Sequence, residues 1–293
     1  ETAELAQGYD ALSIITTPID AALMERFAGM GIKMISTRTV GYDHIDLEAA
    51  ERFGDEIGNV PTSPYSVSDY TVMLILMAIR KLKRLMQRCS INDFSVRGLL
   101  GMELHNCTVG VVGTGHIGQA VIRALSGFGC RILAYDPFES LAVKEYAQYV
   151  PLEQLYRESD IIHLHAPMSE ENEHMICKET IALMKPGVLI VNTARGGLIH
   201  TGDLIDALIS GKVGGAALDV IEREGAMFYH DLKTEILDHR ELMILKELPN
   251  VIFTHHMAYY TDQAMEDRVH YSVESCWRVL NGMENPWKVR ASQ

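Results

Sequence analysis

Short apolar segments that alternate with helical patterns constrain the fold of this 293-residue chain more than any other feature. Their residues are apolar almost throughout, whereas a strand with one wet face would be apolar at every second position. Such strands, separated by helices, predict parallel sheets with helices on both faces, which is a doubly wound α/β fold of the Rossmann type. The segments are 11–15, 33–37, 107–113, 131–136, 160–166, 188–194, 214–220 and 250–254.

Two long helical patterns interrupt this alternation, and we predict that they connect two domains. One begins near Ser66, where SVSD resembles a helix cap, and extends to about Arg88; the other covers 261–280. The segments outside them would together form a second, smaller α/β domain. The predicted organisation is a central domain of residues 65–261 and a smaller domain built from residues 1–64 and 262–293.

Charge and cysteine content limit the partners and the compartment. A formal net charge of -13 disfavours nucleic acid and anionic membranes as partners. The five cysteines are scattered without a close pair, which is typical of a reducing compartment. The longest apolar run, 72–79, is too short to cross a bilayer, and no signal peptide is evident. We therefore expect a soluble cytoplasmic protein.

A glycine turn between a strand and a helix predicts a dinucleotide site. In VGVVGTGHIG, residues Gly113, Gly115 and Gly118 form the pattern G-x-G-x-x-G. The first glycine permits the tight turn, the second lets the backbone approach a pyrophosphate, and the third lets helix and strand pack closely. The helix N-terminus then offers free N–H groups to the phosphates.

The next strand ends in Asp136, which favours NAD over NADP. A carboxylate at this place accepts hydrogen bonds from the ribose diol and repels a 2′-phosphate. Sites for FAD or S-adenosylmethionine remain alternatives on this evidence, so the catalytic residues must decide among them.

Three neighbouring strand ends bring an arginine, acids and histidines to one edge of the predicted sheet. VLIVNTARGG ends on Arg195, LDVIEREG carries Glu222 and Glu224, and the last strand runs into His255 and His256. An arginine holds an anion, an imidazole moves a proton, and a carboxylate beside an imidazole favours its charged form. This set suits hydride transfer beside a dinucleotide.

A second pair of histidines, His163 and His165, alternates on one strand. Two histidines on one face can begin a metal site, but no third ligand is evident in the sequence. We therefore expect no metal.

These motifs in this order resemble the D-isomer-specific 2-hydroxyacid dehydrogenases. The nearer likeness is to the branch of D-lactate, (R)-2-hydroxyisocaproate and vancomycin-resistance enzymes. The resemblance implies NAD-dependent interconversion of a 2-oxo acid and its (R)-2-hydroxy acid by a homodimer. It rests on VGVVGTGHIG, AYD, VNTARGG, LDVIERE and HHMAYYT, together with the stretches 36–46 and 65–80.

The family's catalytic roles can be placed on this sequence residue by residue. The resemblance implies that Arg195 binds the substrate carboxylate and polarises the keto group. Glu224 is the last acid of D-V-x-E-x-E and would raise the pKa of the catalytic imidazole, whereas Glu222 has no role in the pattern. His256 heads H-x-A-[FY]-Y-T and would be the acid/base, while His255 stands where the family usually has proline.

The resemblance also implies binding residues. Thr62 falls where D-lactate enzymes tend to carry a tyrosine, which favours a branched or aromatic 2-oxo acid over pyruvate. The substrate residues implied are Val40 and Gly41 through their backbone N–H groups, Thr62, Arg195 and Tyr259. The cofactor contacts implied, beyond the three glycines and Asp136, are His116, Ile117, Ala166, Pro167, Asn172, Thr193, Ala194 and Asp219.

Two alternatives and one departure remain. An NAD-sensing corepressor of the same fold can keep the same triad, and a dehydrogenase of glycerate, phosphoglycerate or formate belongs to the same family. The long segment 224–250 favours the lactate-like branch. The resemblance implies a flavodoxin-like smaller domain. In the family this domain opens with a βαβ segment before the part that matches 8–15, so we expect the smaller sheet to lack strands here.

Overall fold

The computed structural model describes residues 2–291, without the side chains of Thr2 and Ala226. Contacts divide the chain into two units. Unit 1 consists of the residues up to Ser63 and from Tyr260 onward, and unit 2 is Pro64–Tyr259. Among the described residues, no helix is long and apolar enough to cross a membrane.

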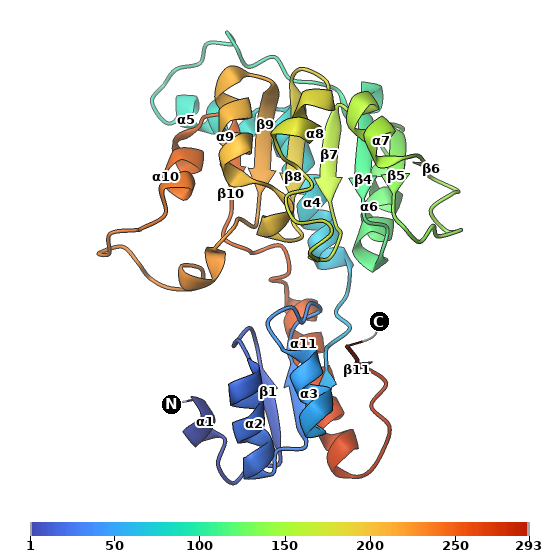
Figure 1. Ribbon diagram of the computed structural model, residues 1–293. Helices are drawn as coiled ribbons and strands as arrows, with labels where there is room; N and C mark the ends of the chain where they lie inside the picture. The colour runs from blue at the N-terminus through green and yellow to red at the C-terminus, as the bar shows by residue number, and fades with distance from the viewer. Residues whose placement is uncertain (1, 292–293) are drawn as a thin grey trace. The chain divides into compact units, whose positions relative to one another are not determined.

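Unit 2 is built on a seven-stranded sheet in which every strand is parallel to its neighbours (Figure 1). The strand order is β10-β9-β8-β7-β4-β5-β6. The chain adds β5 and β6 on one side of β4 and then β7 to β10 on the other side. This arrangement confirms the predicted Rossmann-type sheet. The strands are β4 (Thr108–Val112), β5 (Arg131–Tyr135), β6 (Gln148–Tyr149), β7 (Ile161–Leu164), β8 (Val188–Asn192), β9 (Val213–Leu218) and β10 (Val251–Phe253).

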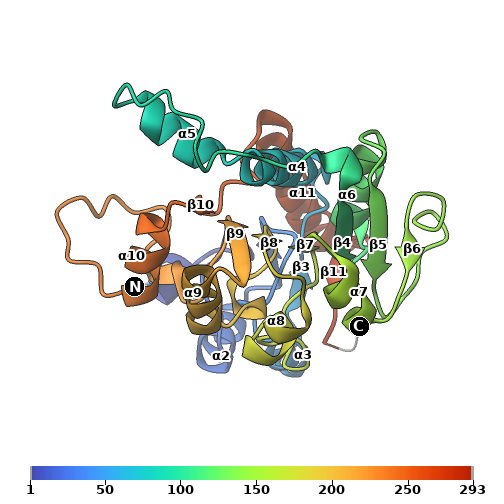
Figure 2. The same cartoon turned by 90° about the horizontal axis from the view of Figure 1, so that it is seen from above.

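Helices cover both faces of this sheet, as the apolar strands require (Figure 2). One apolar core lies under α4 (Tyr65–Ile79) and α6 (His116–Ser126). The other lies under α7 (Leu152–Glu158), α8 (Lys178–Leu183), α9 (Thr201–Ser210) and α10 (Arg240–Glu247). Single 3₁₀ turns are η1 (Leu104–Asn106), η2 (Gly196–Leu198) and η3 (Glu224–Ala226).

The prediction of a single helix from Ser66 to Arg88 is wrong, because the chain forms two helices there. Helix α4 ends at Ile79, and α5 (Leu82–Cys89) starts after Lys81, whose φ of 52° is left-handed. The returning chain explains the break: the N–H of Met102 donates to the Ile79 carbonyl, which a continuing helix would need for itself. SVSD is not the cap, since Pro64 precedes the first helical residue.

Unit 1 has a smaller sheet in the order β1-β2-β3-β11, in which only β11 runs antiparallel. Its core gathers apolar side chains of α2, α3 and the strands around Phe27 and Ile35. The predicted helix over 261–280 is confirmed as α11. The elements are α1 (Thr2–Leu5), β1 (Ala11–Ile14), α2 (Ala21–Met30), β2 (Met34–Thr37), α3 (Leu47–Phe53), β3 (Glu56–Gly58), α11 (Asp262–Leu280) and β11 (Lys288–Val289).

Candidate active site

The glycine turn between β4 and α6 leaves room for a ligand at one glycine and none at the other two. A Cβ on Gly118 would lie 2.1 Å from the Gly113 carbonyl oxygen, and one on Gly113 would lie 2.6 Å from the backbone nitrogen of Ala166. Gly113 also has a φ of 95°, which favours glycine. A Cβ on Gly115 would meet no atom within 4 Å. Open space before the N-terminus of an 11-residue helix suits a pyrophosphate.

Asp136 follows β5 and joins this turn. One carboxylate oxygen accepts the N–H of Thr114 at 2.6 Å, and the other accepts the N–H of Phe138 at 2.9 Å. The carboxylate is therefore held beside the glycine turn, where a ribose diol can donate to its remaining lone pairs. The residues of the turn and of the β5 end thus fit a dinucleotide without a 2′-phosphate.

Of the other predicted cofactor residues, His116 and Ile117 begin α6 and Asp219 directly follows β9. The remaining five lie on loops at the carboxyl ends of β7 and β8. Asn172 closes the loop after β7, since its amide donates to the Pro167 carbonyl and accepts from the N–H of Ser169. After β8, the Thr193 hydroxyl is buried against that of Thr71 on α4 at 2.8 Å. Both loops begin at the edge of the sheet where the glycine turn lies, because all the strands are parallel and each of these segments follows a strand.

Arg195 is held by a turn that the last residue of β8 organises. The side chain of Asn192 accepts the N–H of Ala194 and donates to the Arg195 carbonyl. Gly196 follows, and a Cβ there would lie 2.0 Å from the Ile221 carbonyl carbon, so this loop packs backbone to backbone on the loop after β9. The loop with the arginine and the loop with the acids are therefore in contact.

His256 and Glu224 form a close pair. The Nδ1 atom of His256 lies 2.6 Å from Oε1 of Glu224, and both side chains are partly buried. The other carboxylate oxygen of Glu224 accepts the N–H of Ile221 at 2.9 Å. His256 has a φ of 59°, a left-handed conformation that is uncommon outside glycine. Of the two neighbouring histidines, His255 is exposed and His256 is the one that meets a carboxylate.

Asp219 holds the strained turn that carries His256, a contact that the sequence did not indicate. Its buried carboxylate accepts the N–H groups of Met257 and Ala258, each at 2.9 Å, and the hydroxyl of Thr254 at 2.6 Å. Its carbonyl accepts the N–H of His256. These bonds fix the left-handed residue from both sides, and a contact between Asp219 and the cofactor stays a prediction.

Two tyrosines flank the histidine, and sequence reasoning identified only Tyr259. The rings of Tyr229 and Tyr259 have centroids 6.5 Å and 6.0 Å from that of His256. The hydroxyl of Tyr229 donates to the His256 carbonyl at 2.9 Å, and burial raises its pKa above the ordinary value. Tyr229 lies in the segment 224–250, whose sequence has no periodicity that would have marked it.

The remaining predicted substrate residues belong to unit 1. The Val40 carbonyl accepts from the side chain of Asn59, and the Gly41 carbonyl accepts from the hydroxyl of Thr39. Thr62 is partly buried. The loop around Val40 is thus held through its carbonyl groups, and substrate binding by its N–H groups stays a prediction.

Comparison with known proteins decides the family. Residues 72–258 match the family model described as D-isomer specific 2-hydroxyacid dehydrogenase, NAD binding domain. The chain belongs to this family. An aromatic 2-oxoacid reductase of Clostridium sporogenes is 46% identical over 270 residues, covering 91% of this chain and 82% of that protein. A D-specific alpha-keto acid dehydrogenase of Enterococcus faecalis is 44% identical over 277 residues, covering 94% and 84%.

A solved structure leads to the same family. D-lactate dehydrogenase from Aquifex aeolicus, complexed with NAD and lactic acid, matches with a TM-score of 0.89 at 35% identity, covering 96% of this chain and 85% of that one. The predicted family, fold and NAD cofactor are confirmed. This D-2-hydroxyacid dehydrogenase homologue is an oxidoreductase, and the roles of its single residues remain predictions.

Proposed function

We propose that this dehydrogenase reduces a bulky, branched or aromatic 2-oxo acid to the (R)-2-hydroxy acid, with His256 as acid/base. The observation that carries the proposal is the 2.6 Å contact between Nδ1 of His256 and Glu224. A carboxylate only accepts, so Nδ1 carries the hydrogen of this bond. Nε2 is then the ring nitrogen available to exchange a proton with substrate.

Each catalytic residue has a distinct task in this proposal. When bound, NADH supplies the hydride that reduces C2 of the keto acid. Nε2 of protonated His256 donates to the forming alkoxide, and in the reverse direction neutral His256 accepts the hydroxyl proton. Arg195 binds the carboxylate of the substrate and stabilises negative charge on the keto oxygen. Glu224 holds the imidazole in one tautomer and offsets its positive charge.

The choice of a bulky substrate rests on the aromatic residues around the histidine. Tyr229 and Tyr259 present rings within 6.5 Å of the His256 ring, and aromatic rings pack well on other aromatic or branched groups. Thr62, in the family position where a tyrosine is usual in D-lactate enzymes, is smaller. The name of the Clostridium sporogenes relative, an aromatic 2-oxoacid reductase, agrees with this choice.

The test is NADH oxidation with pyruvate, 2-oxoisocaproate and phenylpyruvate as substrates. We expect kcat/KM to be highest for phenylpyruvate or 2-oxoisocaproate. His256→Gln should lower kcat by roughly 10²- to 10⁴-fold while NADH still binds. His255→Pro is the matched control and should keep kcat within about threefold, since His255 is exposed. NADH binding without turnover of any keto acid would instead favour an NAD-sensing protein.

We also propose a homodimer formed through an arm of unit 2, defined here as residues 80–101. Helix α5 in this arm buries none of its residues, and Figure 2 shows it projecting from α4. Phe94, Val96 and Leu100 on the arm are 75%, 85% and 88% exposed, although all are apolar. Exposed apolar surface of this extent is typical of an interface.

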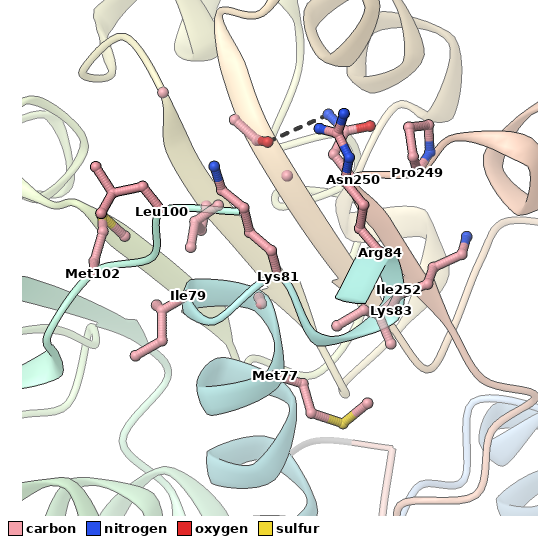
Figure 3. Close-up of a pocket in the computed structure, with 15 residues that line it drawn as sticks. Met77, Ile79, Lys81, Lys83, Arg84, Leu100, Met102, Pro249, Asn250 and Ile252 are labelled. Carbon is pink, nitrogen blue, oxygen red and sulfur yellow. Dashed lines mark hydrogen bonds between the residues drawn. The ribbon is translucent and has the colours of Figure 1, made fainter. Parts of the chain in front are cut away.

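The arm and the surface around its base support a second copy of the chain as the occupant. Six basic residues and one acidic residue lie between 80 and 97, in a chain whose net charge is -13, so the arm attracts the rest of a second copy. At its base lies a cavity of about 520 Å³, where Leu100 and Met102 lie next to Ile79 (Figure 3). The arm and the cavity of one chain both present apolar side chains, which permits a reciprocal, two-fold interface.

Light scattering after size-exclusion chromatography tests this interface. The wild type should show about twice the chain mass of 32.7 kDa. Phe94→Asp combined with Val96→Asp should shift it to the monomer mass, while Phe138→Asp, which replaces another exposed aromatic outside the arm, should not. A monomeric wild type at micromolar concentration would refute the proposal.

A further inference from the structure

Glu222, which has no role in the family pattern, lies at the junction of three loops in unit 2. One carboxylate oxygen accepts a hydrogen bond from Nε2 of His174 at 2.7 Å. The other accepts two from Thr201, from its N–H at 2.8 Å and from its hydroxyl. These partners lie in the loop after β7 and at the start of α9, while Glu222 follows β9. A single carboxylate thus joins the segments that follow three parallel strands.

The three loops carry the predicted cofactor and catalytic residues. The loop after β7 contains Asn172, the loop between β8 and α9 contains Arg195, and Glu222 stands two residues before Glu224. The first two loops are joined by backbone hydrogen bonds, from the N–H of His174 to the Gly197 carbonyl and from that of Ile176 to the Leu198 carbonyl. The Glu222 carboxylate connects the third loop to both.

The electrostatics show that Glu222 is held as a carboxylate. Burial alone would raise its pKa, but the hydrogen bonds from Thr201 and His174 outweigh burial and lower the pKa below the ordinary value. The backbone of Glu222 is fixed as well, because its carbonyl accepts from Nε2 of His239, which also caps α10. His174 has a left-handed φ of 52°, a conformation that costs energy and is retained where neighbouring contacts impose it.

We propose that Glu222 is a positioning residue that sets the distance between Arg195 and the Glu224–His256 pair. This inference rests on the proposed function. Arg195 and His256 must meet the carboxylate and the keto oxygen of one small substrate, so a shift of either loop separates groups that act together. A misplacement of about 1 Å can lower the rate by about 100-fold. The Gly196 backbone against Ile221 limits how closely the two loops approach, and the hydrogen bonds of Glu222 limit how far they separate.

Paired substitutions separate positioning from simple loss of stability. Glu222→Ala removes the acceptor of three hydrogen bonds and should lower kcat/KM for the keto acid by about 10- to 100-fold, with the NADH dissociation constant within about threefold. Glu222→Gln keeps an oxygen for Thr201 and can donate to His174 in its other tautomer. It should recover kcat/KM to within about fivefold of the wild type.

Two further variants complete the test. Leu208 is buried on the core-facing side of α9, away from the three loops. Leu208→Ala should lower the melting temperature about as much as Glu222→Ala does, but it should keep kcat/KM near the wild-type value. Thr201→Val combined with Glu222→Ala should be no worse than Glu222→Ala alone, because both remove the same contact. The inference would be overturned if Glu222→Ala and Leu208→Ala lowered kcat/KM equally, or if Glu222→Ala kept the kcat/KM of the wild type. An inactive wild type would instead refute the proposed function.

Discussion

Two alanine substitutions in the glycine turn should have opposite consequences for folding and for cofactor binding. At Gly118 the new Cβ would lie 2.1 Å from the carbonyl oxygen of Gly113, and the obstructing atom belongs to the backbone. Ordinary contact would need α6 to move away from β4 by about 1 Å, and overpacking of this kind typically costs about 1–3 kcal/mol. At Gly115 the new Cβ would meet nothing within 4 Å, so the fold should keep its stability.

Thermal unfolding without cofactor and NADH fluorescence titration measure the two effects separately. Gly118→Ala should unfold at a temperature lower by several degrees, which is the shift that about 1–3 kcal/mol produces in a domain of this size. Gly115→Ala should unfold like the wild type but bind NADH at least about tenfold more weakly, because the Cβ enters the space that the phosphates need. Unchanged melting of Gly118→Ala, or unchanged NADH affinity of Gly115→Ala, would refute this reasoning.

Three further predictions concern stability. Burial raises the pKa of Asp55 to about 6, so its ionised form opposes folding above that pH. Asp55→Asn should therefore raise the melting temperature at pH 8, and this gain should vanish below pH 4. His163 is fully buried, and burial lowers its pKa well below 6.5, so acid favours the unfolded chain. His163→Leu should therefore reduce the fall in the free energy of unfolding, measured in urea, between pH 6.5 and 5. Asp46 caps α3 through the N–H of Ala49, and Asp46→Ala should cost about 1 kcal/mol in urea unfolding, whereas an unchanged midpoint would contradict the cap.

Much of the fold could be predicted because its signals are local. Each of the eight predicted strands forms at its predicted place, since a run of apolar residues between turns is buried wherever the sheet is covered on both faces. The glycine turn was also readable, because close backbone contacts at Gly113 and Gly118 exclude any side chain. The two-residue strands β6 and β11 carried no pattern of their own and exist through pairing with longer neighbours.

The sequence by itself determined the parallel α/β architecture, the glycine turn and the candidate histidine. Tertiary structure decided which groups meet. It pairs Glu224 with His256 and Glu222 with His174, although the two acids are two residues apart, and it brings Tyr229 against the histidine from a segment without periodicity. It also ends α4 early, through a hydrogen bond from a residue 23 positions further along. Such contacts depend on how loops that are distant in the sequence pack at one edge of the sheet. The properties of neighbouring residues along the chain do not encode which of these loops meet.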